Sequence, residues 1–148
     1  MAQSVAVQDA TFILEVEGKS LIVGTGVDLS EISRIQDSLD RFGDRFLNRI
    51  YTEREQTYCM RKKHAAESLA ARFAAKEAGA KALGTGIARG VLWKEIEVTH
   101  LPGGRPALLF HGRAAQRAAN MGVTAAHLSL SHGRDLAIAQ VVLEATPE

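Results

Sequence analysis

Hydrophobic and polar residues alternate along this chain with two periods, one typical of strands and one typical of helices. Apolar, β-branched stretches at 11–17 and 20–27 are separated by Gly18 and Lys19, which predicts a β-hairpin near the N-terminus. Helical spacing takes over near residue 30 and is interrupted at Gly43. The first third of the sequence therefore predicts paired strands followed by helices.

Two further helices are marked by residues at their ends. Thr52 and Glu55 have the spacing of a capping box, with Thr52 as the N-cap. A longer helix is expected from about 64 to 83, roughly 30 Å in length, ending at Gly84. Gly79 inside it costs about 1 kcal/mol relative to alanine, which indicates close packing or a ligand at that point.

The second half of the chain is richer in strand patterns. Strands are expected near 95–101 and 107–111, followed by a short helix at 113–121 and a final hairpin that turns at 133–135. Strands and helices are mixed without strict alternation. This favours an α+β fold in a single domain, with a largely antiparallel sheet packed against one long helix and shorter helices.

Composition limits the classes of function. The 148 residues suffice for one core without disulfides, and 18 basic against 17 acidic residues give a net charge of +1. With this balance and 5% aromatic residues, a nucleic-acid partner is not expected. No apolar run approaches the ~18 residues of a membrane helix. A single cysteine, Cys59, and the lack of a signal peptide favour the cytoplasm.

Asp28 is the first candidate for chemistry. It follows the apolar run 21–23 and the segment Gly24-Thr25-Gly26, so we expect a tight turn that leaves the carboxylate at the end of a strand, where ligands are often held. Asp28 could equally be the N-cap of the next helix.

The long helix carries charges in an alanine-rich setting. At the i, i+4 spacing, Arg72 stands over Lys76 and Glu77 over Lys81, so a cation pair and an anion-cation pair lie on adjoining stripes. This surface suits a metal ion and phosphates, although a solvated helix face would look the same. After the helix, Gly84-Thr85-Gly86 completes no Walker motif and either ends the helix or lets a ligand approach the backbone.

Residues 127–132 form a third polar segment. Their period of two places Leu128 and Leu130 toward a core and His127, Ser129 and Ser131 on the opposite face. A zinc site is not expected, because His127 and His132 would point to opposite faces of the strand.

Together these segments resemble the holo-acyl-carrier-protein synthase family of phosphopantetheinyl transferases. The match spans roughly residues 21–144, in the family's order and spacing. The resemblance implies transfer of 4′-phosphopantetheine from coenzyme A to a serine of apo-acyl carrier protein, in fatty acid biosynthesis. It also implies a magnesium cofactor and a homotrimer with active sites between subunits.

The resemblance assigns roles to the polar residues. Asp28 and Glu77 would bind magnesium, with Glu77 and Lys81 as the catalytic residues. Contacts to coenzyme A would come from Arg72, Lys76, Lys81, Gly84, Thr85, Gly86, His127, Ser129, Ser131 and His132. Three candidates for the base that takes the serine proton stay open: a metal-bound water, Glu77 or a histidine.

Arg34, Arg41, Arg45 and Arg49 would share one stripe if the helix continued through Gly43. Acyl carrier proteins are acidic, so the resemblance implies that Arg34, Arg41 and Arg45 bind the carrier protein. A solvated basic face is the alternative.

The chain departs from the family pattern at its start. Residues 1–20 form an extension, expected as an extra strand or a partly disordered segment, and residues 21–148 form the transferase domain. Two other functions stay open: activation of carrier domains in polyketide synthases, and a noncatalytic module that binds coenzyme A or a nucleotide.

Overall fold

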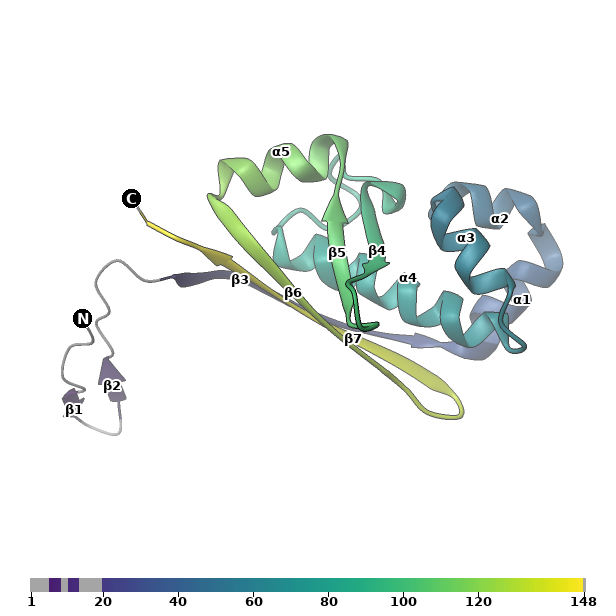
Figure 1. Ribbon diagram of the computed structural model, residues 1–148, viewed down its shortest axis with the longest axis horizontal. Coiled ribbons are helices and arrows are strands. Elements are labelled where there is room, and N and C mark those ends of the chain that lie inside the picture. Colours follow the sequence, from purple (N-terminus) through teal and green to yellow (C-terminus); the bar gives the residue numbers. More distant parts are fainter. Residues whose placement is uncertain (1–5, 9–10, 14–19, 148) are drawn as a thin grey trace.

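The computed structural model describes residues 6–8, 11–13 and 20–147. Figure 1 shows helices and antiparallel strands in one α+β arrangement, as the sequence predicts. In chain order the elements are β1 (Ala6–Gln8), β2 (Thr11–Ile13), β3 (Leu21–Glu31), α1 (Ile32–Phe42), α2 (Asp44–Ile50), α3 (Glu53–Met60), α4 (Ala65–Ala82), the 3-10 turn η1 (Trp93–Glu95), β4 (Ile96–His100), β5 (Pro106–Phe110), α5 (Gly112–Asn120), β6 (Val123–His132) and β7 (Leu136–Ala145).

Three long strands form the main sheet in the order β3, β7, β6, and each neighbouring pair is antiparallel. Alternate residues of the central strand β7 are buried on one face, among them Ala139, Val141 and Leu143. These side chains pack with the alanines of α4 in one core. Figure 1 shows α4 lying along this sheet, and the β4–β5 hairpin contacts both α4 and β6. The long helix is therefore the centre of the fold.

Glycines let β3 cross α4 at very short range. A Cβ at Gly24 would lie 2.1 Å from a backbone carbonyl oxygen of α4, and one at Gly26 would lie 1.9 Å from another. The expected turn at these glycines is wrong, because β3 continues to Glu31 and places Asp28 in mid-strand. The alternative role of Asp28 as a helix cap is also wrong, since Glu31 is the N-cap of α1.

Helices α1, α2 and α3 gather at one end of the molecule (Figure 1). The break at Gly43 is confirmed: this residue has φ 53° and separates α1 from α2. The capping box is also confirmed, because the Glu55 amide donates to Thr52 Oγ1 at 3.2 Å and the Thr52 amide donates to Glu55 Oε1 at 2.9 Å. A second core cluster, which includes Tyr51, joins these helices to the first half of α4.

The later elements agree with the sequence to within a few residues. A Cβ at Gly79 would lie 3.0 Å from a methyl group of Ile96, so close packing explains this glycine. The alternation in β6 is confirmed, since Leu128 is buried and Ser129 is exposed. The β6–β7 pairing confirms the final hairpin.

The hairpin expected near the N-terminus is wrong in its pairing. Residues 11–13 pair with residues 6–8, and β3 pairs with β7. The proposed turn at Gly18 and Lys19 lies outside the described residues. Among the described residues, no helix is long and apolar enough to cross a membrane.

Candidate active site

The contact between Asp28 and Lys81 brings the first and second of the candidate segments together. Lys81 Nζ donates to Asp28 Oδ1 at 2.8 Å and to the Val27 carbonyl oxygen at 3.0 Å. The Asp28 side chain is 20% exposed and that of Lys81 is 52% exposed. A carboxylate on the sheet and a lysine on the last turn of α4 thus form an ion pair that solvent can reach.

Glu77 lies one helical turn before Lys81, on the same side of α4. Its Oε1 accepts a hydrogen bond of 3.0 Å from the indole nitrogen of Trp93. The sequence gives no signal for this contact, because the two residues belong to different elements. Glu77 is half-buried and adjoins the helix turn that contacts Asp28 and Gly26.

Asp28 and Glu77 fit a magnesium ion by their chemistry. Magnesium prefers oxygen ligands and commonly takes one or two protein carboxylates, with water and substrate phosphates completing its shell. Asp28 already faces a cation, the ammonium group of Lys81. Within the ranges that the structure describes, no group of three or more His, Cys, Asp or Glu side chains is placed to hold a metal.

Lys76 precedes Glu77 in the sequence, but its side chain points into the core, and its assignment to coenzyme A stays a prediction that this burial disfavours. Its side chain is fully buried. The ammonium donates to Glu55 Oε1 at 2.6 Å, to the Ile96 carbonyl at 2.8 Å and to the Trp93 carbonyl at 3.1 Å. Burial lowers the pKa of Lys76, and the nearby Glu55 carboxylate opposes that shift. All three ammonium protons are used inside the core, which favours a structural role for Lys76.

Arg72 is also largely buried, at 4% exposure, but it borders a cavity. Its guanidinium lies 4.4 Å from the centre of the Tyr58 ring and donates to the Ser68 carbonyl at 3.2 Å. Within the part of the chain that the structure describes, the Nε atom of Arg72 has no hydrogen-bond partner. The Tyr58 ring in turn stacks on His100, with 4.6 Å between ring centres.

This cavity, of about 530 Å³, collects positive charge around an aromatic wall. We call it the cationic pocket. Its lining residues are Tyr58, Lys62, Lys63, His64, Glu67, Ser68, Ala71, Arg72, His100, Pro106, Leu130 and His132. The sequence pointed to Arg72 and His132 but missed the basic run Lys62-Lys63-His64, whose clustering was the available signal.

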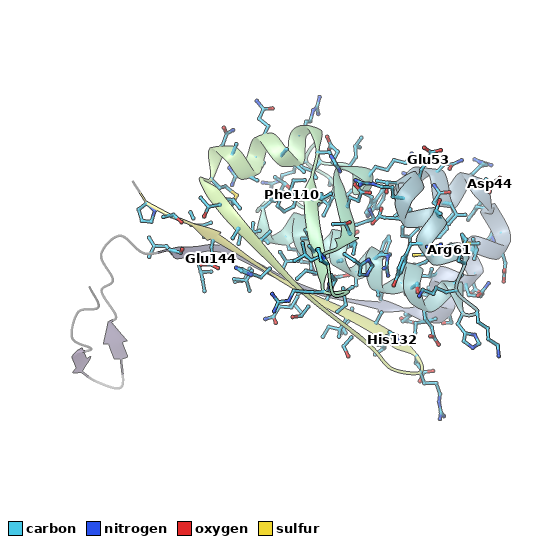
Figure 2. All side chains as sticks on the ribbon, viewed as in Figure 1. Asp44, Glu53, Arg61, Phe110, His132 and Glu144 are labelled. Atoms are coloured by element: carbon cyan, nitrogen blue, oxygen red, sulfur yellow. The ribbon has the colours of Figure 1, made fainter. Side chains whose placement is uncertain are left out.

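The other residues of β6 lie elsewhere. Ser129 and Ser131 are exposed on the outer face of the sheet, which α4 does not cover. His127 hydrogen-bonds Glu144. Figure 2 shows Glu144 and His132 at opposite ends of the sheet. Within one copy of the chain, His132 alone of these candidates borders the cationic pocket, and the roles assigned to the others stay predictions.

The loop after α4 closes the helix. Gly84 has φ 77° and Gly86 has φ 60°, a region that favours glycine. The amides of Thr85 and Gly86 both donate to the Ala80 carbonyl, at 3.2 and 3.1 Å. The structure therefore accounts for these glycines as a helix stop, and contact of this loop with coenzyme A stays a prediction.

Two adjoining cavities of about 510 and 350 Å³ lie where α1 and α2 meet η1. We call them together the Trp93 groove. They share the residues Ser38, Phe46, Ile50 and Trp93. Arg34 borders the first cavity, and Arg45 and Arg49 border the second. An apolar floor is thus edged by arginines.

The condition for a single basic stripe, a helix that continues through Gly43, is not met, because Gly43 ends the first helix. Arg34 and Arg41 belong to α1, and Arg45 and Arg49 belong to α2. Arg41 lies over the Phe42 ring, 5.3 Å from its centre, and borders neither cavity.

Comparisons with known proteins place the chain in a family. The family model of the 4′-phosphopantetheinyl transferase superfamily matches residues 24–141. A holo-[acyl-carrier-protein] synthase from Koribacter versatilis is 56% identical over 124 residues, which cover 84% of this chain and 99% of that protein.

Solved structures of the same kind share the fold. The holo-[acyl-carrier-protein] synthase of Neisseria meningitidis is 34% identical with a TM-score of 0.76, over 83% of this chain and 98% of that one. The synthase of Bacillus anthracis, in complex with CoA (3′,5′-ADP), is 40% identical with a TM-score of 0.70, over 84% and 98%. These findings confirm the resemblance, and the chain belongs to the 4′-phosphopantetheinyl transferase superfamily.

Proposed function

We propose that this protein transfers the 4′-phosphopantetheine arm of coenzyme A to a serine of apo-acyl carrier protein, in fatty acid biosynthesis. The serine oxygen forms a bond to the phosphorus of the arm and loses its proton. The bond to the departing phosphate breaks, which releases adenosine 3′,5′-bisphosphate. The observation that carries this proposal is the Asp28–Lys81 contact with Glu77 one helical turn away.

Charge neutralisation is the main requirement of such a reaction, because the pyrophosphate repels nucleophiles. Asp28 and Glu77 would hold magnesium, which supplies positive charge to the phosphates when bound. Lys81 has an exposed ammonium beside Asp28 and would contact the phosphates directly. Trp93 fixes one oxygen of Glu77 through its N–H.

The cationic pocket is our candidate for the nucleotide end of coenzyme A. Arg72 and Lys81 are nine residues apart on α4, or roughly 14 Å along the helix axis. Lys62 and Lys63 offer charge for a phosphate, and the stacked rings of Tyr58 and His100 form an aromatic wall beside them. The Bacillus anthracis relative was solved in complex with CoA (3′,5′-ADP), which supports a coenzyme site in this chain.

The Trp93 groove is our candidate for the docking surface of the carrier protein. Acidic helices would meet Arg34, Arg45 and Arg49 at its edge, while apolar side chains would meet Phe46 and Ile50. Arg41 would act at the periphery of this surface. Long-range attraction between an acidic partner and a basic rim raises the rate of association more than it strengthens the complex.

A homotrimer would explain the outer face of the sheet. Val27 is 54% exposed, Leu29 is 59% exposed and Ile138 is 39% exposed on neighbouring strands. Contiguous apolar patches are rare on monomers and commonly mark interfaces. Ser129 and Ser131 lie on the same face of the sheet. In a homotrimer they would therefore lie next to a neighbouring subunit and could contact the coenzyme bound there.

The test is intact-mass analysis of an apo-acyl carrier protein incubated with the enzyme, coenzyme A and magnesium chloride. A gain equal to the phosphopantetheine arm is expected, whereas a noncatalytic module would leave the mass unchanged. Glu77→Gln and Asp28→Asn should abolish turnover at ordinary magnesium. Lys81→Ala should slow it by ~10²–10³-fold, the effect of losing one electrostatic stabiliser, yet keep the magnesium dependence. Near-wild-type rates for Glu77→Gln would overturn the metal role.

A further inference from the structure

Trp93 occupies an unusual position between the candidate metal site and the Trp93 groove. Its indole N–H donates to Glu77 Oε1 at 3.0 Å. Its ring lies 6.1 Å from the Phe73 ring, centre to centre, and the Arg49 guanidinium lies 5.6 Å above it. The contacts with Phe73 and Arg49 hold the ring in one orientation, so its N–H stays directed at Glu77.

We propose that Trp93 is a positioning residue that orients Glu77 for magnesium. This inference rests on the role of Glu77 proposed above. An indole N–H is a donor only, so it engages one oxygen of the carboxylate. Oε1 is thereby fixed, and Oε2 has no hydrogen-bond partner among the described residues and is left to face a cation.

The placement of Glu77 makes such a partner necessary. A glutamate side chain has three rotatable bonds, and its ordering costs conformational entropy each time a metal binds. Asp28 is already restrained by the Lys81 ammonium at 2.8 Å, whereas the Trp93 N–H is the one hydrogen bond that the described residues give to Glu77. Partners that hydrogen-bond metal ligands typically change metal affinity or activity by ~10–100-fold when removed.

The discriminating variant is Trp93→Phe, which keeps an aromatic ring against Phe73 and beneath Arg49 but lacks the N–H. We expect the magnesium concentration that gives half the maximal rate to rise ~10–100-fold, measured at a saturating concentration of carrier protein. A purely structural role predicts the opposite pattern, with fewer active molecules and an unchanged magnesium midpoint. Lys94→Ala is the matched control, because Lys94 is an exposed neighbour in the same 3-10 turn.

Fluorescence gives a readout independent of turnover. Trp93 is the only tryptophan of the sequence, so the indole emission comes from this residue alone. Titration of wild type with magnesium chloride in the presence of coenzyme A should change the emission, with the same midpoint as the activity. Glu77→Gln should lose this response. The fluorescence titration needs no Trp93 variant, so it tests the positioning role even if Trp93→Phe fails to fold.

The outcomes separate this inference from the proposed function. If Glu77→Gln is inactive but Trp93→Phe keeps the wild-type magnesium midpoint, the positioning role is refuted and the metal role stands. If wild-type emission stays constant while activity saturates with magnesium, the positioning role is likewise refuted. If Glu77→Gln is as active as wild type, the metal role itself fails. A raised midpoint in Trp93→Phe together with a magnesium-dependent emission change supports the inference.

Discussion

Replacement of Lys76 by methionine should cost stability and leave coenzyme binding intact. The side chain is fully buried, and its ammonium donates three hydrogen bonds at 2.6 to 3.1 Å. Methionine has a similar length but no charge. In Lys76→Met the Glu55 carboxylate would keep its bonds from the Thr52 and Val98 amides, both at 2.9 Å, and lose its counter-charge.

The expected loss is about 3–5 kcal/mol, the usual effect of leaving one member of a buried ion pair alone. That is a large part of the ~5–15 kcal/mol by which domains of this kind are stable. Urea unfolding followed by Trp93 emission would measure it, at one fixed protein concentration because assembly would add to the apparent stability.

A double variant makes the reasoning stricter. Adding Glu55→Gln to Lys76→Met removes the unpaired Glu55 carboxylate. The double variant should therefore lose less stability than the sum of the losses of the two single variants, with a coupling energy of ~0.5–3 kcal/mol. The KM for coenzyme A should stay close to wild type in the folded variants. A Lys76→Met variant within ~1 kcal/mol of wild-type stability, with a markedly raised KM for coenzyme A, would refute the structural role.

Three further predictions concern other parts of the molecule. Arg45→Glu should raise the KM for the carrier protein on the order of tenfold and weaken the salt dependence of turnover, with the KM for coenzyme A as control. Gly26→Ala should destabilise the fold by ~1–3 kcal/mol by urea unfolding, because the new Cβ would lie 1.9 Å from the Ala78 carbonyl oxygen; wild-type stability would contradict the close crossing. Burial raises the pKa of Glu97, but hydrogen bonds from Arg54 and other donors outweigh it and leave the pKa below its ordinary 4.5. The unfolded chain then binds a proton that the folded chain does not, so stability should fall as the pH drops from about 4.5 through the folded pKa. Glu97→Gln should flatten this slope in acid unfolding curves.

The local patterns of the sequence predicted most elements because their signals are local. The capping box at Thr52, the break at Gly43 and the alternation in β6 each depend on residues a few positions apart. Strand partners depend on distant contacts, which is why the expected hairpin near the N-terminus had the wrong pairing. Apolar strands carry no local mark of the strand they will join.

The candidate site shows the same division. The i, i+4 spacing correctly set Glu77 and Lys81 on one side of the long helix. The spacing could not show that Lys76 points inward. The alanines of α4 are distributed all around the helix, so the sequence marks no single apolar face. The partners that decide the matter, Glu55 for Lys76 and Trp93 for Glu77, come from other elements.

The strand order also constrains how this protein can be made. Leu21 pairs with Ala145, and β7 lies between β3 and β6 although it is the last strand in the sequence. During synthesis on a ribosome, β3 and its Asp28 must therefore wait, unpaired in this sheet, until residues 136–145 have emerged. Contacts so distant in sequence slow folding. A chain interrupted before β7 would lack the placement of Asp28 altogether, so truncated products should have no partial activity.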